Sequence, residues 1–172
     1  MPARPASPIR ATLDPLALID LTRFFAAEVA AGQYPFVRYD ERERWHQRIY
    51  RDRRVDVWLI SWLPTQGTAL HDHGGSSGAF TVIQGELTET IADAGLREVA
   101  RGTGESVGFA SSYIHDVRNA GREPAVSVHA YSAPLTSMTY YDLDEAMLRP
   151  IATVHTDDPE HELTADDLLV AS

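Results

Sequence analysis

The sequence predicts a mainly β protein, an antiparallel sandwich or barrel that follows one or two N-terminal helices. Two observations carry this prediction. Short runs of β-branched, aromatic and aliphatic residues follow one another closely from Val55 onward, and glycine-containing turns separate many of them. Antiparallel sandwiches and barrels are built in this way. With 172 residues, 44% of them hydrophobic, the chain can bury a sizeable core and suits a single domain over residues 1–172.

The part before the strands, residues 11–47, is expected to be helical. Asp14 followed by Pro15 is a typical helix start, because aspartate can cap the first turn and proline is tolerated at the first helical position. An apolar pattern of helical period then continues to Gly32, which can end the helix. A short polar helix or turn is expected over residues 40–47.

The barrel itself is expected over residues 55–141, from six short strands. They are residues 55–62, 79–83, 87–91, 106–109, 125–131 and 138–141. The two ends differ from it in composition. Residues 1–10 hold three prolines and few apolar side chains, so we expect disorder there, whereas residues 142–172 form an acidic tail that wraps the barrel or stays partly mobile.

The composition excludes several kinds of site and partner. The chain has no cysteine, which excludes disulfides, thiolate metal sites and a cysteine nucleophile. Its formal net charge of -10 argues against nucleic acid and anionic membranes as partners. No apolar run is long enough to span a bilayer, and the N-terminus lacks the order of a secretory signal. We therefore expect a cytoplasmic monomer.

The strongest chemical signal is a group of histidines. His71 and His73 flank Asp72, and residues two apart on a strand face the same side, so both imidazoles can reach one point. Imidazole nitrogen is a good ligand for first-row divalent metals. Two polar histidines at a strand end are the alternative explanation of this short motif.

The context of these histidines resembles the cupin motifs. Residues 67–85 are similar to the first motif, in which a glycine and His-x-His precede a strand that ends at a turn glycine. Residues 104–119 are similar to the second motif and supply His115. The resemblance implies a cupin barrel, a double-stranded β-helix of jelly-roll type, with a metal on His71, His73 and His115. Most metal cupins add a glutamate soon after His-x-His, but Ser77 and Gly78 stand there, which leaves three neutral ligands.

Residues 45–134 resemble the cysteine dioxygenase family of thiol dioxygenases. The likeness is carried by His-Asp-His-Gly-Gly-Ser from His71 and by Ser-Val-His-Ala-Tyr from Ser127. It implies iron(II), dioxygen and a small thiol as reactants, and a sulfinic acid as the product. It also implies that Tyr131 is the acid or hydrogen-bond donor beside the metal, that His129 orients Tyr131, and that Ser127 orients His129. Ordinary polar filling of a barrel interior is the alternative for this row.

Two further residues follow from the same resemblance. Some family members cross-link a cysteine to the tyrosine; Gly78 holds the matching position here, as in many bacterial relatives, so this cross-link is impossible. The family also binds the substrate carboxylate with an arginine in a Tyr-x-Arg element, which His46-Gln47-Arg48 matches in part. Arg48 is therefore the expected carboxylate ligand, since a guanidinium can donate two parallel hydrogen bonds to a carboxylate. A surface arginine is the alternative.

Several functions stay open on the sequence. Oxidation of L-cysteine to cysteine sulfinate is the leading reaction, and oxidation of 3-mercaptopropionate is the next, because Gln47 lies close to the place of the carboxylate-binding arginine. A cupin isomerase or lyase with manganese, nickel or zinc would need no oxygen. A non-catalytic cupin would bind a small molecule without turnover.

Overall fold

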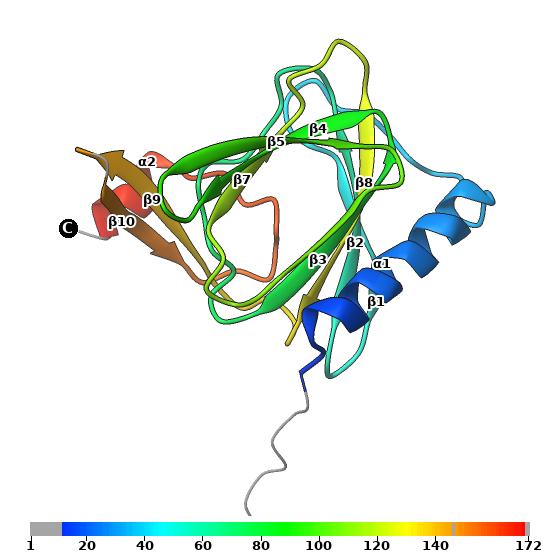
Figure 1. Cartoon of the computed structure of the whole chain (residues 1–172), viewed down its shortest axis with the longest axis horizontal. Helices are drawn as coiled ribbons and strands as arrows, with labels where there is room; N and C mark the ends of the chain where they lie inside the picture. The colour runs from blue at the N-terminus through cyan, green and yellow to red at the C-terminus, as the bar shows by residue number, and fades with distance from the viewer. Residues whose placement is uncertain (1–11, 146, 171–172) are drawn as a thin grey trace, which may run out of the picture.

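The protein is described by a computed structural model that covers residues 12–145 and 147–170 (Figure 1). Helix α1 comes first, ten strands follow within this part of the chain, and a short helix α2 ends it. The bounds are α1 Pro15–Ala30, β1 His46–Arg51, β2 Asp56–Trp62, β3 Ser77–Gln84, β4 Glu86–Ala92, β5 Leu96–Gly102, β6 Ser106–Phe109, β7 His115–Arg118, β8 Ala125–Ser132, β9 Met138–Asp144, β10 Met147–Val154 and α2 Ala165–Val170. The predicted mainly β architecture with an N-terminal helix is confirmed.

Two sheets face each other around the barrel interior. The larger sheet has the order β1-β2-β8-β3-β6, and the smaller one has the order β5-β4-β7 (Figure 1). Strands β9 and β10 form a separate antiparallel pair beside the barrel. Neighbours β2, β8 and β3 are far apart in sequence, so the chain crosses between the sheets, and the interior collects side chains from all of them.

The central strands of the larger sheet are buried on both faces. In β2, Val57 and Leu59 pack outward with α1, whereas Trp58, Ile60 and Trp62 belong to the interior cluster. The alternation follows from the strand period of two. Strand β8 repeats it: Val126, Val128 and Ala130 face outward, and the residues between them face inward. This is how polar residues of β8 come to lie inside an apolar barrel.

Helix α1 covers the outer face of the larger sheet. Its start agrees with the sequence, since the Asp14 side chain accepts a hydrogen bond from the Ala17 amide at 2.9 Å and proline occupies the first turn. The buried positions Leu18, Thr22 and Phe25 are spaced by four and three residues, so they form one face of the helix. The helix therefore seals the sheet on the side away from the barrel interior.

The expectations for residues 40–47 and 55–141 need correction. Residues 41–43 bend and strand β1 begins at His46, so the helical part ends well before residue 47 and the sheet begins before residue 55. Strand β1 was missed because it is an edge strand that lies only partly buried and carries charged side chains.

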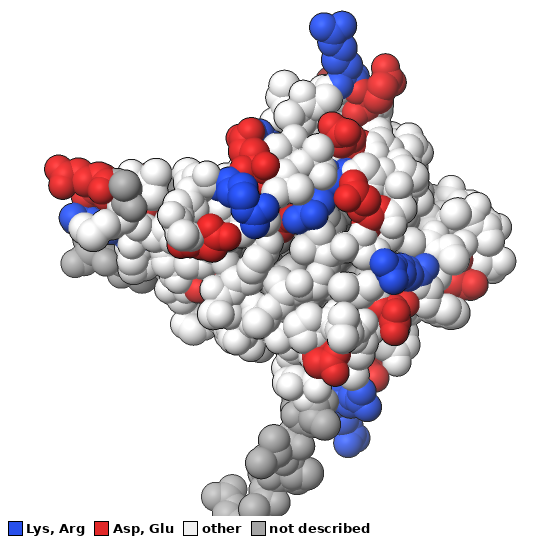
Figure 2. Space-filling view, viewed as in Figure 1, with Lys and Arg blue, Asp and Glu red and all other residues white. Residues whose placement is uncertain are grey.

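The acidic tail is more regular than its composition indicates. Strand β9 runs on to Asp144, β10 pairs with it, and α2 follows, so residues 142–172 contain a hairpin arm and a helix. The disorder expected for residues 1–10 concerns a segment outside the described residues. No helix in the described ranges is both long and apolar enough to cross a membrane. On the face drawn in Figure 2, acidic side chains stand among the basic ones without a continuous basic area.

Candidate metal centre and active site

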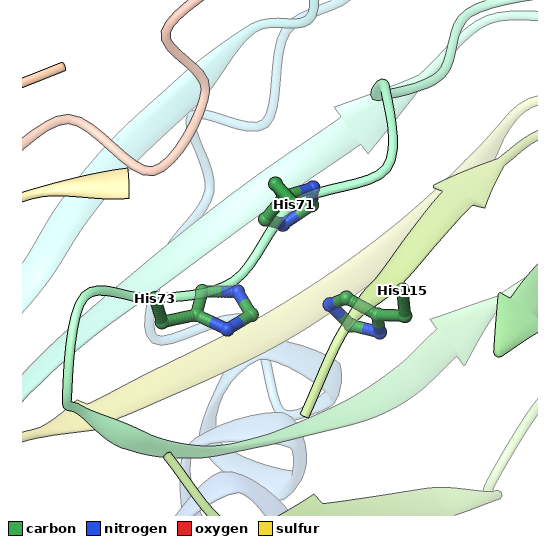
Figure 3. Close-up of side chains that lie close together, drawn as sticks. All are labelled: His71, His73 and His115. Carbon is green, nitrogen blue, oxygen red and sulfur yellow. The ribbon is translucent and has the colours of Figure 1, made fainter. Parts of the chain in front are cut away.

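Three histidines from two segments meet inside the barrel. His71 and His73 lie on the chain that leads into β3, and His115 is the first residue of β7. His71 and His115 pair through their backbones in an isolated bridge, with N–H···O distances of 2.9 and 3.1 Å. Gly74 then turns the chain with φ +57°, and a Cβ there would lie 2.1 Å from Ser137 Oγ, so only glycine fits. The three rings point toward a common space (Figure 3).

The geometry leaves one nitrogen of each ring for a metal. One ligand atom from each histidine lies within 4.8 Å of the other two. His71 Nδ1 donates to the Ala69 carbonyl at 2.7 Å, and His115 Nδ1 donates to Glu89 Oε1 at 2.8 Å, so Nε2 of each ring is the nitrogen left for a metal. His73 Nε2 is buried and has no hydrogen-bond partner in the described part of the chain. An unpartnered buried nitrogen beside two free ones is what a tridentate metal site requires.

All three histidines are buried, and burial keeps the imidazoles of His71 and His73 neutral. His71, His73 and His115 are 3%, 1% and 2% exposed. Burial, with the nearby His115 as a smaller contribution, lowers the pKa of His71 to about 3, and burial lowers the pKa of His73 well below its usual value. A neutral imidazole has a free lone pair at neutral pH, so the protein holds its ligands ready for a cation. The residues fit a metal ion bound by nitrogen alone.

Glu89 stands behind His115 and is not part of the three-residue metal group. This fully buried carboxylate on β4 accepts hydrogen bonds from His115 Nδ1, from Arg101 Nη2 at 2.7 Å and from the Tyr113 hydroxyl at 3.0 Å. Burial opposes its charge, but these partners outweigh burial and lower the pKa of Glu89. Sequence reasoning missed this role. The available signal was the spacing of Glu89, which is two residues from apolar Leu87, so both side chains lie on the same inward face of the strand.

Ser127, His129 and Tyr131 form a row on the inward face of β8, close to the histidines. Ser127 Oγ lies 2.8 Å from His129 Nε2, and His129 Nδ1 lies 3.4 Å from Tyr131 Oη. The ring of Tyr131 stacks on that of His73, with centroids 5.0 Å apart. The structure therefore brings this predicted row into contact with the histidine group.

Trp62, which sequence reasoning did not single out, gives the row its direction. Its indole N–H, which can only donate, donates to Ser127 Oγ at 2.9 Å. Ser127 then satisfies its own buried hydroxyl hydrogen by donating to His129 Nε2. This leaves the proton of the neutral imidazole on Nδ1, directed at the Tyr131 oxygen. The hydroxyl hydrogen of Tyr131 is thereby free to point into the cavity.

The pKa values of the row support the same assignment. Burial lowers the pKa of His129 to about 3, so its ring is neutral. Burial raises the pKa of Tyr131 well above its usual value, and nearby acidic groups including Glu160 and Asp56 add to the effect. Tyr131 therefore stays protonated and acts as a hydrogen-bond donor.

Gly78 lies directly against Tyr131. The two residues are paired between β3 and β8, and a Cβ on Gly78 would lie 3.2 Å from Tyr131 Cδ1 and 2.4 Å from the ring of Phe109. Phe109 in turn stacks on His73 with centroids 4.9 Å apart. The position that the resemblance assigns to a cross-linking cysteine is therefore beside the tyrosine, and Phe109 fills the space.

Arg48 is not among the residues that line the cavity beside the histidines. Its guanidinium lies 4.4 Å from the ring centroid of Trp58 and donates to Asp157 Oδ2 at 2.7 Å. The cavity is lined by His71, His115, His129 and Tyr131 together with Glu160 of the tail and a few neighbours. Arg44 does not line the cavity either, but it lies behind this wall: it is 5% exposed, forms an ion pair with Glu160 and lies 5.7 Å from the ring centroid of Trp62, and both of these partners line the cavity.

Four side chains from Arg44 to the end of β1 form a cationic row in which each member has an acidic partner in the tail; they are Arg44, His46, Arg48 and Arg51. Between Arg44 and Arg48, His46 Nε2 lies 3.1 Å from Asp158 Oδ1. Burial lowers the pKa of His46, but the hydrogen bond and charge of Asp158 outweigh burial and raise it to about 9. His46 is therefore cationic at neutral pH.

Comparison with known proteins gives a family match over most of the chain. The family model described as cysteine dioxygenase type I matches residues 24–144. Cysteine dioxygenase type 1 of Danio rerio is 33% identical over 101 residues, which cover 52% of this chain and 50% of the relative. The chain thus matches about half the length of that curated relative.

Solved structures support the fold. A protein from Thermus thermophilus superposes with a TM-score of 0.53 at 21% identity, over 58% of this chain and 92% of the other. A Klebsiella pneumoniae protein described as having a double-stranded β-helix domain gives a TM-score of 0.51 at 19% identity, over 67% and 90%. These likenesses agree with the two facing sheets, and the predicted cupin fold is confirmed.

Proposed function

Because the chain belongs to the cysteine dioxygenase type I family, we propose that it is an iron(II)-dependent thiol dioxygenase that adds both atoms of dioxygen to the sulfur of a small thiol. L-Cysteine, giving cysteine sulfinate, is the leading substrate, and 3-mercaptopropionate is the alternative. The observation that supports this best is the position of the Ser127–His129–Tyr131 row, whose tyrosine stacks on one of three clustered buried histidines.

His71, His73 and His115 are the proposed ligands of the iron. Their free Nε2 atoms supply three neutral donors, and the described residues add no carboxylate to this group. When bound there, iron(II) supplies the redox chemistry that couples dioxygen to a thiol. Neutral ligands leave the full positive charge of the cation in the cavity, and this charge favours the deprotonated form of a thiol. The hydrogen bonds from Nδ1 to Ala69 and Glu89 hold two of the rings in orientation.

Tyr131 is the proposed hydrogen-bond donor to the reacting atoms. Its hydroxyl hydrogen is free because the row from Trp62 through Ser127 and His129 supplies the oxygen with a donor of its own. A fixed donor in a dry cavity can stabilise negative charge that develops on oxygen without reorganising in the reaction. His129 and Ser127 act through Tyr131 and position it.

Binding of the substrate carboxylate is proposed for the cationic row before and along β1. Arg48 is the residue that the family resemblance favours, and Arg44 is the arginine that contacts two residues of the cavity wall, Glu160 and Trp62. Either guanidinium can take a carboxylate through paired hydrogen bonds. Each now pairs with an acidic residue of the tail, Asp157 for Arg48 and Glu160 for Arg44, so the carboxylate must replace one of these.

We further propose that the protein works as a cytoplasmic monomer on small molecules alone, without nucleic acid or membrane. The formal net charge of -10 supports the exclusion of nucleic acid and anionic membranes. Gel filtration of the metal-loaded protein at working concentration tests the oligomeric state, and a mass near twice 19.0 kDa would contradict the monomer.

Oxygen uptake tests the proposed reaction. Iron-loaded protein is mixed with L-cysteine, 3-mercaptopropionate or cysteamine, and dissolved oxygen and sulfinate are measured together. A thiol dioxygenase consumes one oxygen molecule for each sulfinate formed. Oxygen uptake without sulfinate, or no uptake with any of these thiols, would contradict the proposal. In that case a cupin isomerase or lyase, or a binding protein, becomes the better explanation. Protein loaded with zinc, which has no redox chemistry, is the matched control.

A further inference from the structure

The end of the chain closes the proposed site. After β10 the chain, orange in Figure 1, runs between the β9–β10 hairpin and the barrel. We call residues 157–160, Asp-Asp-Pro-Glu, the acidic strap. The family match ends at residue 144, so the strap lies outside the part that this chain shares with the family model.

The strap binds the cationic row residue by residue. Asp157 accepts from Arg48 at 2.7 Å and from Arg51 at 2.9 Å, Asp158 pairs with His46 at 3.1 Å, and Glu160 pairs with Arg44. The partners run in opposite order along the two segments. Every cation of this row is thus neutralised by the strap, and the largest burial is at its end, where Arg44 is 5% and Glu160 is 7% exposed.

The strap also fills the cavity. Pro159 and Glu160 line the space that is bounded on its other sides by His71, His115 and Tyr131. That space is about 10 Å³, which is room for about one water molecule. A small aminothiol or mercapto acid has several times the volume of water, so it cannot lie against the histidines while the strap keeps this position.

Glu160 lines the cavity and presents its carboxylate to Arg44, which lies behind the cavity wall. Arg44 Nη2 also approaches the Glu160 carbonyl at 3.4 Å. Contacts outside the strap hold Arg44 as well, because Nη1 donates to the Gly67 carbonyl and the guanidinium lies 5.7 Å from the ring centroid of Trp62, which lines the cavity. Nη1 also lies 3.6 Å from Oε1 of the exposed Glu162. Arg48 contacts Asp157 and Trp58, neither of which lines the cavity.

We propose that the strap is displaced when substrate binds and that Arg44 then takes the carboxylate of a mercapto acid in exchange for Glu160. The inference rests on the proposed function and narrows its substrate class to thiols that carry a carboxylate. Such a thiol replaces the ion pair between Arg44 and Glu160 by another charge-assisted contact, so displacement of the strap costs little binding free energy. A thiol without a carboxylate, such as cysteamine, leaves Arg44 buried with only the exposed Glu162 as an acidic neighbour, and it binds more weakly. Arg44 and Glu160 are then the residues that determine specificity.

Hydrogen exchange of the iron-loaded protein without oxygen tests the displacement. Binding of L-cysteine or 3-mercaptopropionate is first measured by calorimetry, and backbone exchange over residues 155–162 is compared with and without saturating ligand. We expect faster exchange in this segment when either thiol is bound. Unchanged exchange with bound ligand, or failure of both thiols to bind the wild type and Glu160→Gln, would overturn the proposal.

Variants separate the roles of the two residues. Glu160→Gln keeps a hydrogen-bond acceptor and loses the charge, so the strap opens more easily and L-cysteine binds about tenfold more tightly. Arg44→Gln removes the proposed anchor and reduces the preference for L-cysteine over cysteamine about thirtyfold. The double variant Arg44→Gln/Glu160→Gln, which leaves no unpaired buried charge, loses the preference in the same way. It covers the case in which Arg44→Gln alone fails to fold.

One control and one discriminating variant fix the interpretation. The control, Asp144→Asn, breaks an exposed ion pair with Arg149 far along the β9–β10 hairpin and leaves affinity and preference unchanged. The discriminating variant is Arg48→Gln, at the other candidate anchor: the assignment to Arg44 requires that the preference survives in it, and loss of the preference in Arg48→Gln with retention in Arg44→Gln would overturn that assignment. All these measurements record binding, not turnover. If they succeed while no thiol is oxidised in air, the proposed function fails and the strap exchange stands. If the thiols are oxidised but the preference for L-cysteine does not change in Arg44→Gln, the strap exchange fails and the proposed function stands.

Discussion

Trp62 governs the chemistry of the β8 row although it contributes no reactive group. An indole N–H has one possible role, so it fixes Ser127, and the remaining hydrogen bonds follow as far as Tyr131. Phe80, stacked on His129 at 5.1 Å, keeps the ring in its plane. The tyrosine hydroxyl therefore has one free hydrogen and one defined direction.

Replacing Tyr131 by phenylalanine tests this direction. Tyr131→Phe keeps the ring that stacks on His73 and removes the hydroxyl alone. Thiol oxidation should slow by about 100- to 1000-fold, as for loss of one oriented donor. Iron content should stay near that of the wild type. Parallel oxygen and sulfinate measurements give the rate and the coupling.

Trp62→Phe is the companion variant. It leaves Tyr131 in place but frees Ser127 from its donor, so its effect should be weaker and in the same direction. If Tyr131→Phe retained full rate and coupling, the row would be polar filling of the barrel.

At the same scale, the sequence identified the residues that are close in the chain or marked by a motif. Sequence motifs with characteristic spacing mark the metal ligands and the β8 row, so these residues were found; the ligands are His71, His73 and His115. Glu89, Trp62 and Arg44 were not found as partners of these residues. Their roles arise from contacts across the barrel, between residues 26, 65 and 116 positions apart.

The elements of the fold differ in how well their patterns predict them. Strands β2, β3 and β8 are buried on both faces, so their β-branched and apolar runs stand out in the sequence, and β6 was placed at its observed bounds. Strand β5 was missed because all its residues are at least partly exposed, and β7 because Val117 is the one apolar residue among its four. Strand β1 and the strap contact each other through ion pairs. Their sequences therefore lack the periodic apolar pattern by which strands are predicted.

Helix α1 offers a direct test of element packing. Leu18 is fully buried against the outer face of the larger sheet, whereas Leu16, two residues away, is 75% exposed. Leu18→Ala should lower the free energy of unfolding by about 3 kcal/mol, because it removes buried methyl groups and leaves a cavity. Leu16→Ala, the matched control, should change it by less than about 0.5 kcal/mol. Urea unfolding followed by circular dichroism measures both. Equal effects would mean that the helix does not pack as described.

For the molecule as a whole, the core and the proposed metal centre are separable. One apolar cluster lies between α1 and the sheet, a second fills the barrel, and a third holds the β9–β10 hairpin. None of them needs a cation. Metal should therefore add stability by mass action without being required for folding.

Removal of the metal tests this separation. Chelation of the iron-loaded protein should leave its far-ultraviolet circular dichroism and a cooperative unfolding transition, with a lower melting temperature. His115→Ala and His73→Ala should each reduce the iron content strongly below that of the wild type while remaining folded. Metal analysis and thermal melts are the measurements. Full iron content in His115→Ala would remove that residue from the site, and a non-cooperative apo protein would show that the core depends on the metal.

The crowding around Gly78 has an evolutionary consequence. In a lineage that carries both Gly78 and Phe109, a single substitution to cysteine at position 78 meets the Phe109 ring, so the tyrosine cross-link of some relatives is hard to acquire in one step. A cysteine at position 78 would place its Cβ 2.4 Å from the Phe109 ring, and that ring also supports His73. A smaller residue at position 109 has to come first, and by itself it loosens a proposed ligand of the metal. Each of the two substitutions is thus harmful without the other. Sequences with glycine at position 78 and phenylalanine at position 109 therefore tend to keep both residues.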